Sequence, residues 1–285
     1  MSSLGRVVIN GVEYSPDEAV VSAFDRGLQF GDGLFETLAV RDGNALLAER
    51  HYQRLQKGCL SLGIDTGDSF DAIRDAAERV QSDVAKGVLK IIVTRGSSGR
   101  GYAVDEGLPP TWMVSLSEYP DWPAAFAKQG VNLRICKTPA GRNRALAGIK
   151  HLNRLENVLA RAELAPDEQE GLLVDENGDV IEGSMSNLFA VGDGVLATPD
   201  LTCSGVCGIM RGALLETAAE LSITTKVRQM PASGLAHWDE LFLCNSLIGI
   251  WPIKQIKHVG KYTTGPITRK LQQALREAKI AVVDV

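Results

Sequence analysis

Three short turn signals constrain the fold of this chain more than any other feature. Asn10-Gly11, Asp42-Gly43 and Asn177-Gly178 each lie between runs of apolar residues. Such dipeptides are typical of the two-residue turns that join antiparallel strands. Parallel strands instead need long crossover connections. The sequence therefore predicts an α+β fold rather than a regular alternation of parallel strands and helices.

The rest of the chain contains both helical and extended patterns. Apolar residues recur at helical spacing in several segments, as Leu55, Cys59 and Leu62 do. We predict helices over residues 49–62, 68–82, 151–164, 211–221 and 267–279, and strands over residues 88–94, 111–116, 131–136 and 240–244. The proline-rich stretch 119–123 indicates a linker. We expect a small N-terminal α/β domain over 1–118, a linker over 119–126 and a larger C-terminal domain over 127–285.

The composition argues against several classes of protein. The net charge of −5 disfavours a general nucleic-acid binder, which usually carries a basic face. No apolar run approaches the ~20 residues that span a bilayer, so we expect no membrane partner. The five cysteines are scattered and no secretory signal follows Met1, which predicts reduced thiols in the cytoplasm. Cys203 and Cys207 have the spacing of half a metal site, but no second pair lies nearby and we expect no metal.

Lys150 lies between a loop and the helix predicted from residue 151. A lysine that forms a covalent link to an aldehyde needs a fixed position and a lowered pKa. The apolar neighbours Leu146, Ile149 and Leu152 favour a half-buried amine. The positive end of the helix dipole would also disfavour the ammonium form. The alternative interpretation is an ordinary solvated lysine.

Glu182 follows an apolar strand and precedes the small polar residues Gly183–Asn187. A carboxylate at such a position can pair with a protonated pyridine nitrogen, which keeps the ring an effective electron acceptor. The alternative is a turn carboxylate that accepts hydrogen bonds from backbone amides. The combination of Glu182 with Lys150, rather than either residue alone, favours a cofactor site.

A phosphate site needs backbone amides at a helix start and a cation nearby. The stretch Gly205–Gly212 places glycines directly before a predicted helix. Arg54 is our candidate for the cation, although an exposed helical arginine is the alternative. Asn245 and Ser246 can add donors to the same anion. The chain lacks the lysine pattern of a phosphate-binding loop, so a nucleoside triphosphatase is not indicated.

These segments together resemble one family, the fold-type IV pyridoxal-phosphate enzymes. The motifs that carry the resemblance are Phe30–Thr37, Arg50–Leu55, Lys150 and Ile181–Asn187. The family has a two-domain fold like that of D-amino-acid aminotransferases, and it includes branched-chain aminotransferases and 4-amino-4-deoxychorismate lyases. The resemblance runs from about Asn10 to Trp251, and Val88–Tyr102 and Leu146–Glu156 are most similar to the bacterial lyases.

The resemblance implies that the cofactor is pyridoxal 5'-phosphate. The cofactor-binding residues that it implies are Lys150, Glu182, Arg54, Ile209, Met210, Asn187 and Ser246. In this set Lys150 holds the aldehyde and Glu182 pairs with the pyridine nitrogen. Arg54 and the backbone amides of Ile209 and Met210 hold the phosphate.

The resemblance also implies a reaction. A cytoplasmic homodimer would convert 4-amino-4-deoxychorismate into 4-aminobenzoate and pyruvate for folate synthesis. Lys150 would act as general base, and Thr37 would relay a proton to the departing group. Arg95 and Arg100 are expected to pair with the two substrate carboxylates, because a guanidinium matches carboxylate geometry. Tyr102 would line the same pocket.

Two alternatives stay open. Glu36 stands where aminotransferases of the family often have glutamate, so an aminotransferase acting on D- or branched-chain amino acids is the second hypothesis. Thr37 and the loop over residues 95–102 favour the lyase instead. The third hypothesis is a non-catalytic protein that keeps the fold. The presence of Lys150, Glu182 and Arg54 together argues against it.

Overall fold

The computed structural model describes residues 5–281, and the chain divides into two compact units. The first unit extends to Pro120 and includes Ile149–Asn153, whereas the second comprises Asp121–Gly148 and the chain from Arg154 onward. The first break therefore lies in the proline-rich stretch. The five residues Ile149–Asn153, which we assigned to the C-terminal domain, group with the first unit instead.

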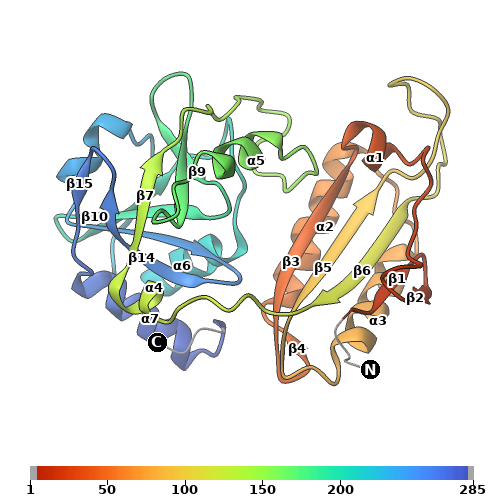
Figure 1. The fold of residues 1–285 in the computed structure, drawn as a ribbon, viewed down its shortest axis with the longest axis horizontal. Coiled ribbons are helices and arrows are strands. Elements are labelled where there is room, and N and C mark those ends of the chain that lie inside the picture. The colour runs from red at the N-terminus through yellow and green to blue at the C-terminus, as the bar shows by residue number, and fades with distance from the viewer. Residues whose placement is uncertain (1–4, 282–285) are drawn as a thin grey trace. The chain divides into compact units, whose positions relative to one another are not determined.

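The first unit is a six-stranded antiparallel sheet with helices on one face. The strand order is β2-β1-β6-β5-β3-β4. The elements are β1 (Val7–Ile9), β2 (Val12–Tyr14), α1 (Arg26–Phe30), β3 (Gly33–Arg41), β4 (Asn44–Ala45), α2 (Ala48–Leu62), α3 (Ser69–Gln81), β5 (Lys86–Thr94) and β6 (Thr111–Ser117). Helix α2 contacts β3, and α3 contacts β5 and β6 (Figure 1). The turns Asn10-Gly11 and Asp42-Gly43 join antiparallel strands as predicted.

Burial alternates along the first half of β3. Leu34, Glu36 and Leu38 are buried, whereas Phe35 and Thr37 between them are only half-buried. Because successive side chains of a strand point to opposite faces, the first set faces the helices and the second set lines the open face of the sheet. The core under α2 and α3 is formed by such buried side chains, including Leu34, Leu38, Leu55, Ile73, Leu89 and Ile91.

The second unit is built on a mixed nine-stranded sheet with the order β12-β11-β10-β13-β14-β7-β8-β9, in which β15 pairs with β14. Its strands are β7 (Val131–Ile135), β8 (Glu170–Val174), β9 (Val180–Gly183), β10 (Asn187–Gly192), β11 (Val195–Pro199), β12 (Thr225–Arg228), β13 (Glu240–Asn245), β14 (Gly249–Ile256) and β15 (Gly260–Lys261). Its helices are α4 (Ala125–Gln129), α5 (Leu155–Ala162), α6 (Ile209–Glu220), the 3₁₀ helix η1 (Ala232–His237) and α7 (Pro266–Glu277). Strand β9 also contacts β10 and β11, so the sheet curls back on itself.

Helices pack against this sheet at several strands. Helices α4 and α7 contact β14, α6 contacts β13, and α5 contacts β8 (Figure 1). The core includes Leu172, Leu188, Leu243 and Trp251, all with 2% exposure or less. The turn at Asn177-Gly178 joins β8 and β9 as predicted. Two sheets, with strands and helices mixed along the chain, confirm the α+β prediction.

Within residues 5–281, no helix combines the length and the apolar character that a membrane crossing requires.

Candidate active site

Lys150 is held by its backbone against the edge of β3. The N–H of Phe35 donates to the carbonyl of Lys150 at 3.0 Å, and the N–H of Leu152 donates to the carbonyl of Gly33 at 2.9 Å. Between them, Leu34 and His151 form an antiparallel bridge. The ammonium nitrogen of Lys150 lies 4.2 Å from the centroid of the Phe35 ring. The amine is therefore presented on the open face of the first sheet.

The start of the following helix differs from our expectation. Helix α5 begins at Leu155 rather than at residue 151. The residues before it adopt an extended path because they satisfy hydrogen-bonding groups at the free edge of β3. Lys150 therefore lies outside the first turn of α5, where a helix dipole acts. The dipole of α5 therefore does not act on the amine of Lys150 as the sequence predicted.

Thr37 lies on the same face as Phe35, two residues along β3. Its cross-strand neighbour in β5 is Lys90, whose ammonium nitrogen lies 5.6 Å from the Phe35 ring centroid. The open face thus carries Phe35 with the Nζ atoms of Lys90 and Lys150 close to its ring, and Thr37 lies next along the strand. Lys90 was missed in the sequence, although a single charged residue inside the apolar run 88–93 indicates a strand with one face open.

Arg54 is oriented by a buried carboxylate. Its Nε donates to Oε1 of Glu36 at 2.7 Å, and its Nη2 donates to Oε2 at 2.5 Å. Nδ1 of His51 lies 2.6 Å from the same Oε2. Such two-pronged pairing fixes the plane of a guanidinium as well as its position. Glu36, which the sequence marked only as an aminotransferase-like residue, therefore positions the predicted phosphate cation.

Charge pairing sets the protonation of this buried group. Burial alone would raise the pKa of Glu36, but the hydrogen bonds and positive charges of His51 and Arg54 outweigh burial and hold that pKa below its usual value. Burial lowers the pKa of His51, and its contact with Glu36 only partly opposes that shift. Glu36 is thus an anion over the whole physiological pH range.

The predicted substrate arginines occupy different environments. Arg95 donates through Nε and Nη2 to Asp32 at 2.8 and 3.0 Å, and it also donates to the carbonyls of Leu62 and Gly63. All three of its nitrogens are thus used inside the first unit, which does not support a contact with substrate. Arg100 is exposed, and Tyr102 is 84% exposed.

Glu182 ends strand β9 in the second unit and is held by amides. Its Oε2 accepts a hydrogen bond from the N–H of Val206 at 2.8 Å and a longer one from Nδ2 of Asn187 at 3.5 Å. The same Asn187 amide donates to the carbonyl of Val206 at 2.9 Å. Glu182 is 6% exposed. Amide donors orient this carboxylate, and its charge also acts on the half-buried guanidinium of Arg154.

The loop after Glu182 rests on a second buried carboxylate that the sequence did not reveal. Glu170 accepts hydrogen bonds from the hydroxyls of Ser184 and Ser186 and from the N–H of Met185. It lies at the first position of β8, directly before an apolar run. A charged residue at the start of a buried strand is the signal that could have identified it, since such a residue needs buried partners.

The start of α6 is shaped to receive an anion. Gly208 is its N-cap, and Ile209 and Met210 are the first helical residues. The first N–H groups of a helix have no intrahelical acceptor, so they can donate to a phosphate. A side chain at Gly208 would come within 2.0 Å of Oδ1 of Asn187. Ser246 follows β13 in a turn where Oδ1 of Asn245 accepts two backbone N–H groups.

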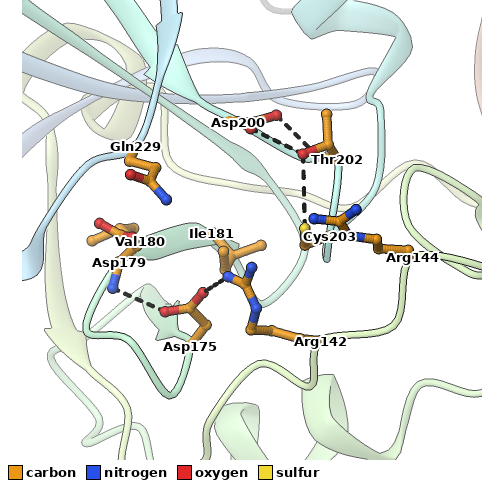
Figure 2. Close-up of a pocket in the computed structure, with 10 residues that line it drawn as sticks. All are labelled: Arg142, Arg144, Asp175, Asp179, Val180, Ile181, Asp200, Thr202, Cys203 and Gln229. Atoms are coloured by element: carbon orange, nitrogen blue, oxygen red, sulfur yellow. Dashed lines mark hydrogen bonds and ion pairs between the residues drawn. The ribbon is translucent and has the colours of Figure 1, made fainter.

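Cys203 lies in a separate pocket of the second unit. Figure 2 shows its thiol beside the Thr202 hydroxyl, with Arg142 and Arg144 on the same side of the pocket. Arg142 forms an ion pair with Asp175. Within residues 5–281, no group of three or more His, Cys, Asp or Glu side chains is placed to hold a metal ion.

Comparison with known proteins identifies the family. The family described as amino-transferase class IV matches residues 33–256. This chain belongs to that family. An aminodeoxychorismate lyase from Vibrio harveyi is 34% identical over 252 residues, which cover 87% of this chain and 93% of the relative. The family predicted from the sequence motifs is therefore confirmed.

Two further relatives of this class IV family member bear on its activity. The crystal structure of 4-amino-4-deoxychorismate lyase from Pseudomonas aeruginosa is 44% identical with a TM-score of 0.90, covering 95% of this chain and 98% of that one. A D-alanine aminotransferase from Staphylococcus aureus is 28% identical over 277 residues, which cover 95% of this chain and 97% of the relative. The chain is a pyridoxal-phosphate-dependent enzyme.

The residues described above fit this cofactor. An aldehyde requires an amine at a fixed position, which the backbone of Lys150 provides. A protonated pyridine nitrogen requires a buried carboxylate, and an amide donor orients that of Glu182. A phosphate requires amides and a cation; the first N–H groups of α6 are such amides in the second unit, and Arg54 is a guanidinium oriented by Glu36 in the first.

Proposed function

We propose that this class IV family member is an aminodeoxychorismate lyase, which converts 4-amino-4-deoxychorismate into 4-aminobenzoate and pyruvate in folate synthesis. The observation that carries the proposal is that Lys150 and Thr37 share the open face of the first sheet. An amine and a hydroxyl on one surface supply a base and a proton relay, which an elimination needs. The similarity to two lyases over most of the chain supports the proposal.

Seven residues are proposed to hold the cofactor. They are Lys150, Glu182, Arg54, Ile209, Met210, Asn187 and Ser246. Lys150 binds the aldehyde, and Glu182 binds the ring nitrogen. Asn187 supports this second contact by donating a hydrogen bond that orients the Glu182 carboxylate. When bound, pyridoxal 5'-phosphate accepts the electron pair that is released at the carbon bearing the substrate amine.

The chain itself then moves two protons. The amine of Lys150 removes the proton from the amine-bearing carbon, as general base. The bond between the ring and the ether oxygen breaks, the ring becomes aromatic, and the three-carbon group leaves as pyruvate. Thr37 relays a proton to that departing group. No keto acid is consumed, because the amine stays on the product.

The substrate carries two carboxylates, and we propose that Arg100 and Tyr102 contact it. Both side chains are exposed on one loop of the first unit, where an incoming anion can reach them. Our sequence prediction also included Arg95. Its contacts with Asp32 favour a supporting role in which it fixes the base of that loop.

We also propose a cytoplasmic homodimer. Leu155, Val158 and Leu159 are 77%, 60% and 57% exposed, and their spacing places them on one side of α5. An exposed apolar stripe of this kind is typical of an interaction surface, and a second copy of the chain is the proposed partner. All five cysteines are free, which supports a reducing compartment.

Product analysis with and without an amino acceptor tests the lyase. Purified protein would be incubated with 4-amino-4-deoxychorismate alone, and separately with D-alanine and 2-oxoglutarate. We expect 4-aminobenzoate and pyruvate in equal amounts in the first reaction. Turnover that depends on the keto acid, without an aromatic product, would refute the lyase.

An aminotransferase is the second candidate, and one observation favours it. Glu36 is a residue often found in aminotransferases of the family. Here its buried carboxylate pairs with both Arg54 and His51. The D-alanine aminotransferase relative is consistent with that activity. Formation of pyruvate from D-alanine in the second reaction would establish it beside or instead of the lyase.

A further inference from the structure

Arg26 is a buried arginine whose guanidinium gathers the loop that carries Arg100 and Tyr102. It is 3% exposed, although it lies at the first position of the short helix α1. Its Nη1 donates to the hydroxyl of Ser98 at 3.0 Å and to the carbonyls of Gly101 and Ala103 at 3.2 and 3.0 Å. Its Nη2 donates to the carbonyl of Tyr102 at 3.2 Å.

The charge of Arg26 is balanced by a carboxylate that also anchors the base of the loop. Nε of Arg26 donates to Oδ2 of Asp32 at 2.8 Å, and Nε of Arg95 donates to the same oxygen at 2.8 Å. Burial would raise the pKa of Asp32, but the two guanidinium groups outweigh burial and lower it. Asp32 thus fixes both Arg95, at the start of the loop, and Arg26, which contacts the loop further along.

An aromatic ring extends the same contact to the side chain of Tyr102. The Arg26 guanidinium carbon lies 5.1 Å from the centroid of the Phe30 ring. The Phe30 and Tyr102 rings are 5.2 Å apart at an angle of 58°. The Arg26 guanidinium thus lies near the Phe30 ring, which in turn contacts the Tyr102 ring. Arg26 therefore influences Tyr102 both through the Tyr102 carbonyl and through the Tyr102 ring.

The loop needs such an anchor because its own backbone is permissive. Gly99 and Gly101 lie on either side of Arg100, and Gly101 has a φ of +95°. Glycine allows many conformations, so the sequence alone does not hold Arg100 in one place. Backbone bonds fix the base of the loop, where the N–H of Arg26 donates to the carbonyl of Gly96 at 2.8 Å. Arg26 supplies the side-chain anchor further along.

We propose that Arg26 is a positioning residue that holds the loop 98–103 in the conformation that recognises the anionic substrate. The proposal rests on the proposed function in that this loop contacts the substrate carboxylates. Arg26 acts through Arg100 and Tyr102 and does not itself touch the substrate. A guanidinium suits this task because its planar fork reaches four loop acceptors and a carboxylate at once, whereas a lysine has a single ammonium.

The first test measures loop order directly. Trypsin cleavage after Arg100 would be followed by mass spectrometry in the wild-type protein and in the Arg26→Gln and Arg26→Lys variants. We expect cleavage to accelerate about tenfold in both, since the open loop becomes more populated. Arg74→Gln is the matched control, because Arg74 also pairs with a carboxylate and lies over an aromatic ring, yet belongs to α3. Equal cleavage rates in all four proteins would overturn the proposal.

The second test separates positioning from general damage. If the competent loop is populated about a tenth of the time in Arg26→Lys, KM for 4-amino-4-deoxychorismate rises about tenfold while kcat stays within about twofold. The absorbance of bound pyridoxal phosphate should not change. Faster cleavage with an unchanged KM would show a structural role only and would overturn the assignment. A wild-type protein without lyase activity would remove the proposed function, whereas the trypsin comparison would still decide whether Arg26 holds the loop.

Discussion

The two units hold their functional side chains by different means. In the first unit, cations are paired with buried carboxylates: Arg54 with Glu36, and Arg26 and Arg95 with Asp32. In the second, Glu182 is held by the amide donors of Val206 and Asn187. Ion pairing fixes the geometry of these cations, whereas amide donors set the position of the Glu182 carboxylate, whose charge also acts on the half-buried Arg154. The first arrangement fixes the positions of arginines, whereas the second fixes the position of a carboxylate.

The largest effect is expected at Lys150. Lys150→Ala should lower kcat about a thousandfold or more, because it removes the proposed general base. It should also abolish the borohydride-trapped adduct with pyridoxal phosphate, measured by mass spectrometry of the tryptic peptide. Lys90→Ala is the control, since Lys90 lies near the same Phe35 ring. Trapping at an undiminished yield in Lys150→Ala would show that another amine binds the aldehyde.

Removing the buried carboxylate of the first unit is the next largest change. Glu36→Ala leaves the buried His51 and Arg54 without their anion, which should cost about 3–5 kcal/mol of the free energy of unfolding. Urea denaturation measures this loss. Glu49→Ala is the control, because the pair between Glu49 and Arg74 is exposed and such pairs contribute little. Equal losses in the two variants would contradict the contrast between the units.

In the second unit, neutralising a carboxylate should affect activity more than stability. Glu182→Gln retains an oxygen that accepts from the N–H of Val206 but loses the negative charge. We expect kcat to fall about a hundredfold, or about 2.7 kcal/mol in the barrier, with little change in thermal stability. Glu163→Gln is the matched control, since backbone N–H groups also hold Glu163, away from the proposed site. Unchanged kcat in Glu182→Gln would exclude the proposed pairing with the ring nitrogen.

The pH dependence of stability sharpens the same contrast. The folded-state pKa of Glu36 is lowered, so its stabilisation is complete above the unfolded-state pKa of about 4.3. It is lost as the pH falls from there through the folded-state value, because the unfolded chain takes up the proton first. Glu36→Gln should therefore lose less stability than the wild type between pH 5 and pH 3, by about 1 kcal/mol. Denaturant titrations at each pH measure the free energy of unfolding. Equal losses of stability in the variant and the wild type between pH 5 and pH 3 would contradict this prediction.

The smallest effect concerns a thiol that lies beside arginines in the second unit. Hydrogen bonds with Thr202 and Arg144 lower the pKa of Cys203. Burial instead raises the pKa of three other thiols, to about 12 in Cys59, about 11 in Cys136 and about 12 in Cys244. Iodoacetamide at neutral pH should label Cys203 well before those three, because the thiolate is the nucleophile. Arg144→Gln should slow that labelling, and an unchanged rate would exclude the arginine as its cause.

The sequence predicted turns and strand pairing more reliably than the contacts of single residues. Asn10-Gly11 and Asp42-Gly43 depend on local backbone preferences, which a sequence displays directly. The start of α5 was misplaced because residues 149–153 pair with a distant strand, and no local pattern shows that. The roles of Glu36 and Arg26 depend on partners 6 to 77 residues away, most of them more than ten residues away. Motifs nominated Lys150, Glu182 and Arg54, whereas the carboxylates and arginines that support such residues emerged only from the fold.

Hydrogen bonds at Lys150 and at Leu152 limit how the main chain of Lys150 can move during the proposed catalytic cycle. Because the carbonyl of Lys150 is bonded to Phe35 and the N–H of Leu152 is bonded to Gly33, mainly the torsions of the four-carbon side chain remain adjustable. The Lys150 side chain would then change between its two proposed roles, binding the aldehyde and acting as general base, by rotamer changes alone. Such changes occur in picoseconds to nanoseconds and leave the strand pairing intact. In the proposed cycle, turnover would be limited by bond breaking or by product release, and not by movement of the Lys150 side chain.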